Sequence, residues 1–188
     1  AVKTYPARDI AGAIFVWFGD ALHEEAPEFV PPEQLASPEH SHFLCYADWE
    51  APWRYCYDNL MDPMHGTFLH ANSHTMYQGD TQAHFVTRDT PKGFFFEKEG
   101  QRDVNFDWSE LVDDGALYVR LEIPYPPSGG PGGNFAIVGF ATPIDEDRMA
   151  VFFWRVRKVE GWQRDTWRFL YKTNLEPRHW DVLEQDRT

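Results

Sequence analysis

Short runs of apolar and aromatic residues, separated by turn-forming residues, recur along most of the chain. Such runs predict β-strands, because β-branched and aromatic side chains pack well on a pleated, half-buried surface. The segments that we expect to be strands are 12–18, 83–87, 93–97, 116–123, 135–141 and 149–156. The last two flank a turn-rich link at residues 142–147, which predicts that they pair as an antiparallel hairpin.

Helical spacing of apolar residues is present in two regions. Between residues 53 and 68 one apolar stripe repeats every three or four positions, which predicts a helix with one buried face. The members of this stripe are Trp53, Tyr57, Leu60, Met61, Met64 and Phe68. A second pattern runs from about residue 162 to the end and is interrupted at Pro177, which is well placed as the first residue of a final helix.

The order of these elements predicts the fold class. Strands in the middle of the chain with helices at intervals indicate an α+β fold, in which helices cover one side of an antiparallel sheet. Residues 24–41, dominated by Glu, Pro and Ser, are expected to form a surface excursion. At 188 residues, the chain is expected to be a single domain, residues 1–188, with a substantial core.

Charge and cysteine content narrow the classes of partner. The formal net charge of −13 argues against nucleic acids and anionic membranes, since both would repel the chain. Cys45 and Cys56 are too few for a disulfide framework, so we expect a reduced, cytoplasmic protein. No apolar run is long enough to span a bilayer, and no secretory signal is visible. Because the chain begins at Ala1 rather than at Met, we expect it to be an excised portion of something longer.

The segment richest in chemistry is Asn-Leu-Met-Asp-Pro-Met-His-Gly-Thr-Phe-Leu-His, residues 59–70. Neutral imidazole is the commonest metal ligand among side chains, and His65 and His70 are close enough in sequence to share one ion. Two histidines and one carboxylate, with other positions open, suit ferrous iron in oxygen chemistry. Five positions turn an ideal helix by about 140°, so both rings reach one ion only if the helix distorts or ends, and Gly66 is a weak point. The alternative is two unrelated histidines near a helix end.

Asp62 has two interpretations. It precedes Pro63, and Asp at the N-cap with Pro at the first helical position is a common helix start. Alternatively, its carboxylate accepts the ring N–H of a metal-bound histidine and orients that ring. The two roles are compatible in part, because one carboxylate has two oxygens.

A third, carboxylate ligand must come from elsewhere in the chain, and Asp186 is the candidate. Its helical stripe also contains His179, Val182 and Leu183. A separate, polar stripe contains Asp181, Glu184, Gln185 and Thr188. A carboxylate that aligns with a buried stripe is costly unless it is paired or bound to a metal. The alternative is a frayed, solvated chain end.

The other histidines are weaker candidates. His40 and His42 are expected in a polar loop, and His84 is expected to be a satisfied or surface residue of a strand. His74 follows the motif closely and could line the same cavity, whereas His179 could hydrogen-bond near the site.

A substrate pocket would need apolar lining. Aromatic residues make up 16% of the chain, more than a small core usually needs, so a few are expected to line such a pocket. Arg155, Arg157 and Lys158 are expected in a solvated strand end. No positive cluster is evident that would fix a carboxylate substrate.

The motif at residues 59–70, with Leu-Glu-Gln-Asp-Arg at 183–187, resembles the catalytic domain of Rieske non-heme iron oxygenases, above all the α-subunits that hydroxylate or O-demethylate aromatic compounds. The opening Thr-Tyr-Pro-Ala-Arg-Asp-Ile-Ala-Gly-Ala-Ile-Phe-Val-Trp-Phe-Gly-Asp, residues 4–20, is similar to the segment that follows the Rieske domain. The family's D-x-x-H-x-x-x-x-H supplies two iron ligands, which match His65 and His70, and its third ligand matches Asp186. Asp62 matches the family's aspartate that carries electrons between metal centres across a subunit boundary. Asn59, in the same motif, is taken as a further candidate catalytic residue.

The resemblance implies a helix-grip sheet (START/Bet v 1-like) with helices covering a substrate cavity beside a mononuclear Fe²⁺ ion. It also implies electrons from a [2Fe-2S] Rieske cluster, a ferredoxin or reductase as donor, and a homotrimer. The family's cluster needs C-x-H and C-x-x-H, and the sequence has neither. We therefore expect the catalytic domain alone, truncated at both ends, with the Rieske domain absent from this chain.

The function that the resemblance implies is activation of O₂ to hydroxylate an aromatic or other apolar small molecule, by mono- or dihydroxylation or by oxidative demethylation. Two alternatives remain open. One is a helix-grip ligand-binding module whose histidines are structural. The other is a zinc hydrolase, which is less favoured because such enzymes want a general-base carboxylate beside the ligands and the H-E-x-x-H spacing is absent.

Overall fold

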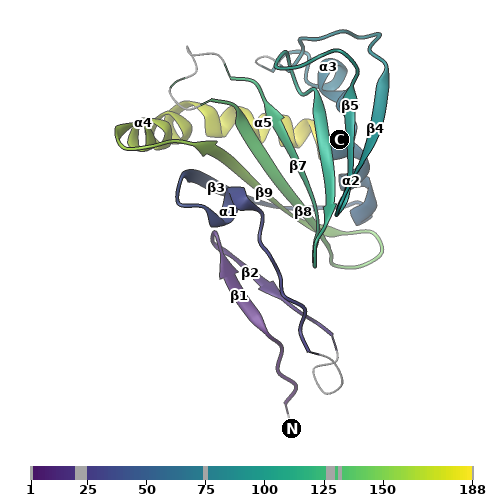
Figure 1. Cartoon of the computed structure of the whole chain (residues 1–188), viewed down its shortest axis with the longest axis vertical. Helices are drawn as coiled ribbons and strands as arrows, with labels where there is room; N and C mark the ends of the chain where they lie inside the picture. Colours follow the sequence, from purple (N-terminus) through teal and green to yellow (C-terminus); the bar gives the residue numbers. More distant parts are fainter. Residues whose placement is uncertain (1, 20–24, 74–75, 126–129, 131–132, 188) are drawn as a thin grey trace.

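A seven-stranded antiparallel sheet forms the centre of the computed structural model (Figure 1), which describes residues 2–19, 25–73, 76–125, 130 and 133–187. Each strand pairs antiparallel with its neighbours. In spatial order the strands are β3 (His40–Trp49), β9 (Met149–Lys158), β8 (Phe135–Pro143), β7 (Leu117–Ile123), β6 (Trp108–Asp113), β5 (Gly93–Lys98) and β4 (Phe85–Thr90). The expected α+β, helix-grip fold is therefore confirmed.

The first strand of the sheet pairs with the last. Strands β4 to β9 follow one another as a meander, and β3 joins its edge at β9 over the full length from His40–Lys158 to Trp49–Met149. The polar loop expected at His40 and His42 is therefore wrong, because both residues lie in β3. Alternation explains the error, since Ser41, Phe43 and Cys45 are buried on one face of this strand while the histidines between them look like loop residues.

Other strand boundaries differ in smaller ways. Strands β5, β7, β8 and β9 match the expected segments to within two residues at each end. Strand β4 begins at Phe85 and extends to Thr90, later than expected, and β6 was not expected at all. The N-terminal apolar run forms one strand, β2 (Ala13–Val16), as expected, and it pairs in a separate hairpin with β1 (Ala7–Ile10), which was not expected.

The helical stripe at residues 53–68 is divided into two helices, α2 (Trp53–Met61) and α3 (His65–Leu69). Asp62 ends α2 with φ −91° and ψ 97°, because the residue before a proline is kept out of the helical region. Phe68 does not belong to the buried face, since 62% of its surface is exposed. The Tyr57 hydroxyl donates to Leu117 O at 2.8 Å and accepts from Ala141 N at 3.1 Å, which fixes α2 against β7 and β8.

The C-terminal helical region runs across one face of the sheet (Figure 1) as α4 (Trp162–Leu170), a π-helical turn η2 (Tyr171–Leu175) and α5 (Glu176–Arg187). Pro177 is the second residue of α5 rather than its first. Proline lacks an N–H and clashes with the carbonyl four residues earlier, and the wider π-helical turn before it accommodates both defects. Tyr171 in this turn stacks on Phe43 of β3 with ring centroids 3.9 Å apart, which anchors the region to the sheet.

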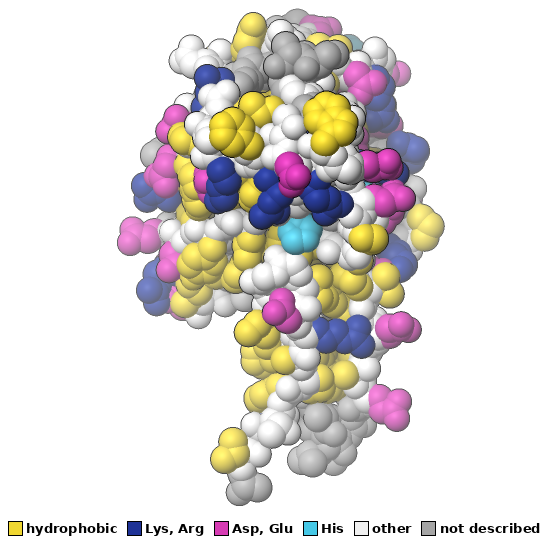
Figure 2. Space-filling model, turned by 90° about the vertical axis from the view of Figure 1, so that its left-hand side faces the viewer, with side chains coloured by type: hydrophobic (Ala, Val, Ile, Leu, Met, Phe, Trp, Pro, Cys, Tyr) yellow, Lys and Arg dark blue, Asp and Glu magenta, His cyan; other side chains and the backbone are white. Residues whose placement is uncertain are grey.

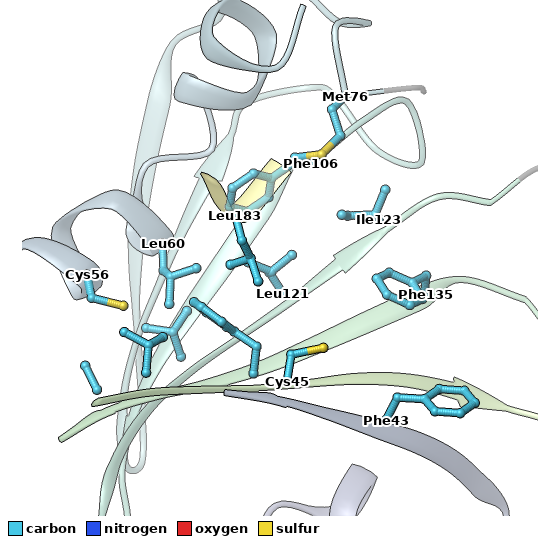
Figure 3. Packing of buried hydrophobic residues seen from close by; sticks show 14 of the residues in the cluster. Phe43, Cys45, Cys56, Leu60, Met76, Phe106, Leu121, Ile123, Phe135 and Leu183 are labelled. Carbon is cyan, nitrogen blue, oxygen red and sulfur yellow. The ribbon is translucent and has the colours of Figure 1, made fainter. Parts of the chain in front are cut away.

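Both faces of the sheet are covered. Helices α2, α4 and α5 cover one face, and residues of the larger hydrophobic cluster lie between them and the strands (Figure 3). The β1–β2 hairpin and α1 (Glu33–Ala36) cover the other face, where Ala13 and Leu35 join a second cluster with Val138, Trp154 and Val156. No helix in the described part of the chain is long and apolar enough to cross a membrane.

Candidate metal centre

The structure brings His65, His70 and Asp186 together. His65 begins α3, His70 ends it, and Asp186 lies in the last turn of α5. His65 Nε2 lies 3.5 Å from Asp186 Oδ1, and His70 Nε2 lies 3.0 Å from the same oxygen. One candidate ligand atom from each residue falls within 4.8 Å of the others, so the three residues form one compact group.

The two histidines converge because α3 is short. On an ideal helix they would point about 140° apart. His70 has left the helical conformation, with φ −100° and ψ 31°, and its ring turns back toward His65. The two ring centroids lie 5.2 Å apart. The helix therefore ends between the two histidines, as one of the two expectations required. It ends after Leu69 rather than at the weak point Gly66.

Each imidazole is oriented through its Nδ1 atom. His65 Nδ1 is 2.5 Å from the main-chain oxygen of Asp62, and His70 Nδ1 is 2.8 Å from Gln185 Oε1. Because both oxygens can only accept, each Nδ1 carries the proton and each neutral ring directs the lone pair of Nε2 toward Asp186. The main-chain carbonyl of Asp62 accepts this ring N–H, whereas one interpretation of the motif predicts that its carboxylate does so.

The Asp62 carboxylate hydrogen-bonds to the backbone instead of to the His65 ring. Its Oδ1 accepts the N–H of Met64 at 2.8 Å, which stabilises the turn that leads into α3. This contact resembles the capping role considered for Asp62, although α3 itself begins at His65. Asp62 therefore contributes to His65 twice, by its carbonyl oxygen on the ring and by its carboxylate on the adjacent backbone.

Asp186 is held at the inner side of α5, as its stripe predicts. Only 7% of its side chain is exposed, and Asn59 Nδ2 of α2 donates to its Oδ1 at 3.3 Å. Gln185, which the sequence analysis assigned to the polar stripe, instead contacts His70. It lies at the boundary between the two faces of α5, where a helical wheel does not separate inward from outward residues. Thr188, also assigned to that stripe, lies outside the described residues.

Burial and charge separate the two imidazoles. Burial lowers the pKa of His65, and the Asp186 carboxylate opposes this shift without cancelling it. Burial also lowers the pKa of His70, but the adjacent Asp186 carboxylate, with Gln185, outweighs this effect and raises the pKa. Burial, with the nearby Asp186 charge, raises the pKa of the Cys56 thiol to about 12, so this cysteine is not a thiolate ligand at neutral pH.

The residues present fit a divalent metal ion. His70 Nε2 is fully buried and has no hydrogen-bond partner among the described residues, although Asp186 Oδ1 is only 3.0 Å away. With the proton on Nδ1, His70 Nε2 and Asp186 Oδ1 present two lone pairs to one shared region, which a bound cation would satisfy. Ligand atoms about 2.1 Å from one ion lie about 3 to 4 Å apart, which the two measured nitrogen–oxygen distances match. Two neutral nitrogens and one anionic oxygen suit Fe²⁺.

A pocket opens beside this group, between the helices and the sheet. Figure 3 shows Leu60, Met76 and Ile123 of its wall among the buried side chains of the larger cluster. The polar residues in the wall are His65, His70, Ser73, Tyr125, Arg155, His179 and Asp186. The apolar residues are Leu60, Met76, Phe106, Leu121, Ile123, Phe135, Ile137, Phe153, Val182 and Leu183. His179 thus lies in the pocket wall.

The remaining histidines lie elsewhere. His84 is exposed next to β4, which agrees with the surface interpretation. His42 on β3 is half-buried, and burial together with Arg168 and Arg164 lowers its pKa. Figure 2 shows Lys and Arg side chains gathered in the middle of the face that it turns to the viewer. His74 lies outside the described residues.

Arg155, Arg157 and Lys158 were expected to lie in a solvated strand end, and this is wrong for the two arginines. Arg155 and Arg157 are 3% and 1% exposed, and only Lys158 points to solvent. They alternate with Trp154 and Val156 of the other core cluster, because both faces of this strand are buried. Arg155 lies in the wall of the pocket. The signal that could have found it is its i, i+2 spacing from Phe153.

Comparison with known proteins agrees with this architecture. A terminal oxygenase of carbazole 1,9a-dioxygenase from Novosphingobium sp. KA1 is similar in fold, with TM-score 0.67 and 20% identity, over 100% of this chain and 57% of the other. Another similar structure is the reduced complex between oxygenase and ferredoxin in carbazole 1,9a-dioxygenase, with TM-score 0.71 and 16% identity over 98% of this chain and 55% of the other. A caffeine-bound NdmA mutant from Pseudomonas putida CBB5 is also similar, with TM-score 0.60 and 13% identity over 97% of this chain and 50% of the other. The chain thus spans between 50% and 57% of the length of these proteins.

Sequence comparison places the chain in a family. No curated protein matches it. The family model for the vanillate O-demethylase oxygenase C-terminal domain matches residues 49–186, a range that includes all three residues of the candidate metal centre. The chain therefore belongs to this family, and the expected identity as the catalytic domain of a Rieske oxygenase is confirmed.

Proposed function

We propose that this domain is a mononuclear non-heme Fe²⁺ oxygenase that inserts oxygen from O₂ into an apolar, aromatic small molecule. The observation that carries the proposal is the convergence of His65 Nε2, His70 Nε2 and Asp186 Oδ1 beside an apolar pocket. These three residues would hold Fe²⁺, which supplies open coordination positions and one-electron chemistry with O₂. Family membership supports the same class of reaction.

The chain's own contribution is orientation and exclusion of water. The carbonyl of Asp62 and the amide of Gln185 fix which ring nitrogens face the ion, and Asn59 positions Asp186 from α2. Asn59 is thus a positioning residue rather than a group that touches substrate. The apolar wall keeps a substrate ring beside the site rather than on it.

Electrons would enter from outside this chain, from a [2Fe-2S] Rieske cluster that a ferredoxin or reductase reduces. One of the similar structures is a complex of an oxygenase with ferredoxin, which supports a donor of this kind. We propose a homotrimer, in which Asp62 carries the electron from a neighbouring subunit's cluster to His65. The bond from the Asp62 carbonyl to the His65 ring supports this route.

Metal analysis tests the proposal. Purified protein, freed of metal by a chelator and reconstituted anaerobically with ferrous salt, should bind about one iron per chain and unfold at a higher temperature. Addition of nitric oxide should give the electron paramagnetic resonance signal of a high-spin ferrous nitrosyl complex. Less than about a tenth of an iron per chain would support a ligand-binding module instead. Hydrolytic activity that depends on zinc would support a hydrolase.

Replacement of Asp62 by asparagine tests the electron route. Asp62→Asn keeps the main-chain carbonyl and the size of the side chain, so iron binding should remain. In the complete enzyme, with its Rieske cluster and electron donor, turnover that depends on the donor should fall sharply. Asp58→Asn, at an exposed position of α2, is the control and should leave both quantities unchanged. Full turnover by Asp62→Asn would exclude the proposed route.

A further inference from the structure

Lys98, the last residue of β5, is a buried cation outside the pocket. Only 2% of its surface is exposed. Its Nζ atom is buried and has no hydrogen-bond partner among the described residues. A lysine is almost never buried unless it is paired, because an ammonium group that leaves water without a partner is costly. The position of Lys98 in the sheet indicates which groups offset this cost.

The strand register places Lys98 beneath the junction between α2 and α3. The main-chain N–H of Lys98 donates to Asp107 O at 2.9 Å, so these two residues lie opposite each other at the end of the β5–β6 pair. Their side chains share a face with Ser109, because alternate residues of a strand point the same way. The Ser109 hydroxyl donates to Met61 O at 3.0 Å. This face of the sheet therefore supports the residue that directly precedes Asp62.

Three carboxylates surround the ammonium group. Burial lowers the pKa of Lys98, and the charges of Asp107, Asp62 and Asp80 oppose this shift. The Asp107 carboxylate is 2% exposed and accepts main-chain N–H groups of its own loop. The Asp62 carboxylate accepts the N–H of Met64 at 2.8 Å. Because these donors are neutral, both carboxylates keep their negative charge, and Lys98 lies where it can offset the two together.

We propose that Lys98 is a positioning residue of the metal centre that acts through Asp62, a proposal that rests on the oxygenase function above. The ammonium group offsets the charge of the Asp62 carboxylate and so keeps this side chain on the N–H of Met64. With its side chain held there, Asp62 presents its carbonyl oxygen to Nδ1 of His65. The effect of Lys98 on the ion is indirect, since it passes through the backbone of the turn before α3.

A double-mutant cycle between Lys98 and Asp62 tests the proposal. Lys98→Met removes the ammonium but keeps most of the side-chain volume, and it should weaken iron binding about tenfold, because two carboxylates then lack their cation. Asp62→Asn alone should bind iron like the wild-type protein. Lys98→Met/Asp62→Asn should recover to within about threefold of the wild-type affinity, because the charge that Lys98 offsets is gone. Competition with a chelator measures each affinity.

Three further variants serve as controls. Lys98→Arg keeps the charge and should retain most of the iron affinity. Lys98→Met/Asp80→Asn should bind iron as weakly as Lys98→Met, because Asp80 is exposed and does not lead into α3. Lys92→Met should leave iron binding unchanged, because the Lys92 side chain is 52% exposed and pairs with Asp114. The electron paramagnetic resonance signal of the ferrous nitrosyl complex should change in Lys98→Met and return in Lys98→Met/Asp62→Asn.

Wild-type affinity in Lys98→Met would overturn the proposal, as would a double variant with Asp62→Asn that binds no better than Lys98→Met. A merely structural lysine would lower stability without changing the affinity or the signal of the folded protein. If Lys98→Met does not fold, recovery of folding on addition of Asp62→Asn supports the proposal, and its absence overturns it. Urea unfolding of the metal-free variants measures the same coupling without iron, so a failure to bind iron would overturn the oxygenase proposal alone.

Discussion

The two faces of the sheet are both covered, and they differ in the side chains beneath the cover. We call the face toward the β1–β2 hairpin, with its aromatic cluster, the closed face, and the face toward the helices, which holds the pocket beside the metal centre, the open face. On the face toward the hairpin, Phe15, Phe140 and Trp154 contact one another with ring centroids 5.2 to 6.3 Å apart. On the face toward the helices, the packing is interrupted by a pocket into which imidazole, carboxylate and guanidinium groups project. The same strands supply both faces by alternation, so the difference lies in what covers them.

This difference separates two kinds of buried residue. Residues of the closed face contribute to stability through contact area, and their replacement should lower the free energy of unfolding. Polar residues of the open face have hydrogen-bonding capacity directed into the pocket, and their replacement should change binding more than folding. Four substitutions test this division, from the largest expected effect to the smallest.

Asp186→Ala should abolish iron binding at the open face, because it removes the only carboxylate of the proposed ligand set. The measurement is iron per chain after anaerobic reconstitution. Glu184→Ala, two residues earlier at an exposed position of α5, is the control and should bind iron normally. A near-stoichiometric iron content in Asp186→Ala would contradict the assignment of this ligand.

Trp154→Ala should destabilise the closed face by about 3 to 5 kcal/mol, because it empties the volume of a buried indole. Trp154 is 1% exposed and also donates to Ala11 O at 2.9 Å. Urea denaturation measures the change, and the iron content of the folded fraction should not alter. Trp162→Ala is the matched control, since Trp162 is 71% exposed and its loss should cost less than about 0.5 kcal/mol.

Gln185→Leu should weaken iron binding about 10- to 100-fold, because it removes the acceptor that orients His70. The free energy of unfolding of the metal-free protein should change much less. Gln185→Glu retains an acceptor oxygen and should restore most of the affinity, as competition with a chelator would measure. Equal loss of affinity in both variants would mean that the side chain acts by shape rather than by its hydrogen bond.

Phe68→Ser should change the free energy of unfolding by less than about 0.5 kcal/mol, because this side chain is 62% exposed. It lies between the two histidines in sequence, in the stripe that periodicity assigned to the core. Leu60→Ala, at a buried position of the same stripe, should cost about 2 to 5 kcal/mol. Thermal or urea unfolding of the two variants separates these expectations.

The sequence was most informative where short-range patterns determine the structure. The alternating and helical periods predicted four strands closely and both helical regions, because each depends on neighbours a few residues away. Asp186 could be selected because its stripe carries Val182 and Leu183, which face the pocket. Strand β3 was missed because its first residues are polar, and only its pairing with the last strand of the chain determines its conformation.

Contacts between distant segments could not be predicted from one chain. The role of Gln185 depends on where α3 ends, and the burial of Arg155 depends on β3 and α5 covering it from two sides. A charged residue near a strand end ordinarily faces solvent, so nothing local distinguishes Arg155 from Lys158. The tertiary structure, rather than the residue type, makes this arginine chemically informative.

The contacts of the metal centre join parts of the chain that are far apart in sequence: Asn59 with Asp186, 127 positions apart, and His70 with Gln185, 115 positions apart. An ion held by these segments would act as a reversible cross-link that closes a loop of more than a hundred residues. Because the unfolded chain has no preformed site, the free energy of metal binding would add to the stability of the folded state. The metal centre would then also hold the C-terminal helix α5 against the rest of the fold. A protein that loses its iron would therefore release this helix first.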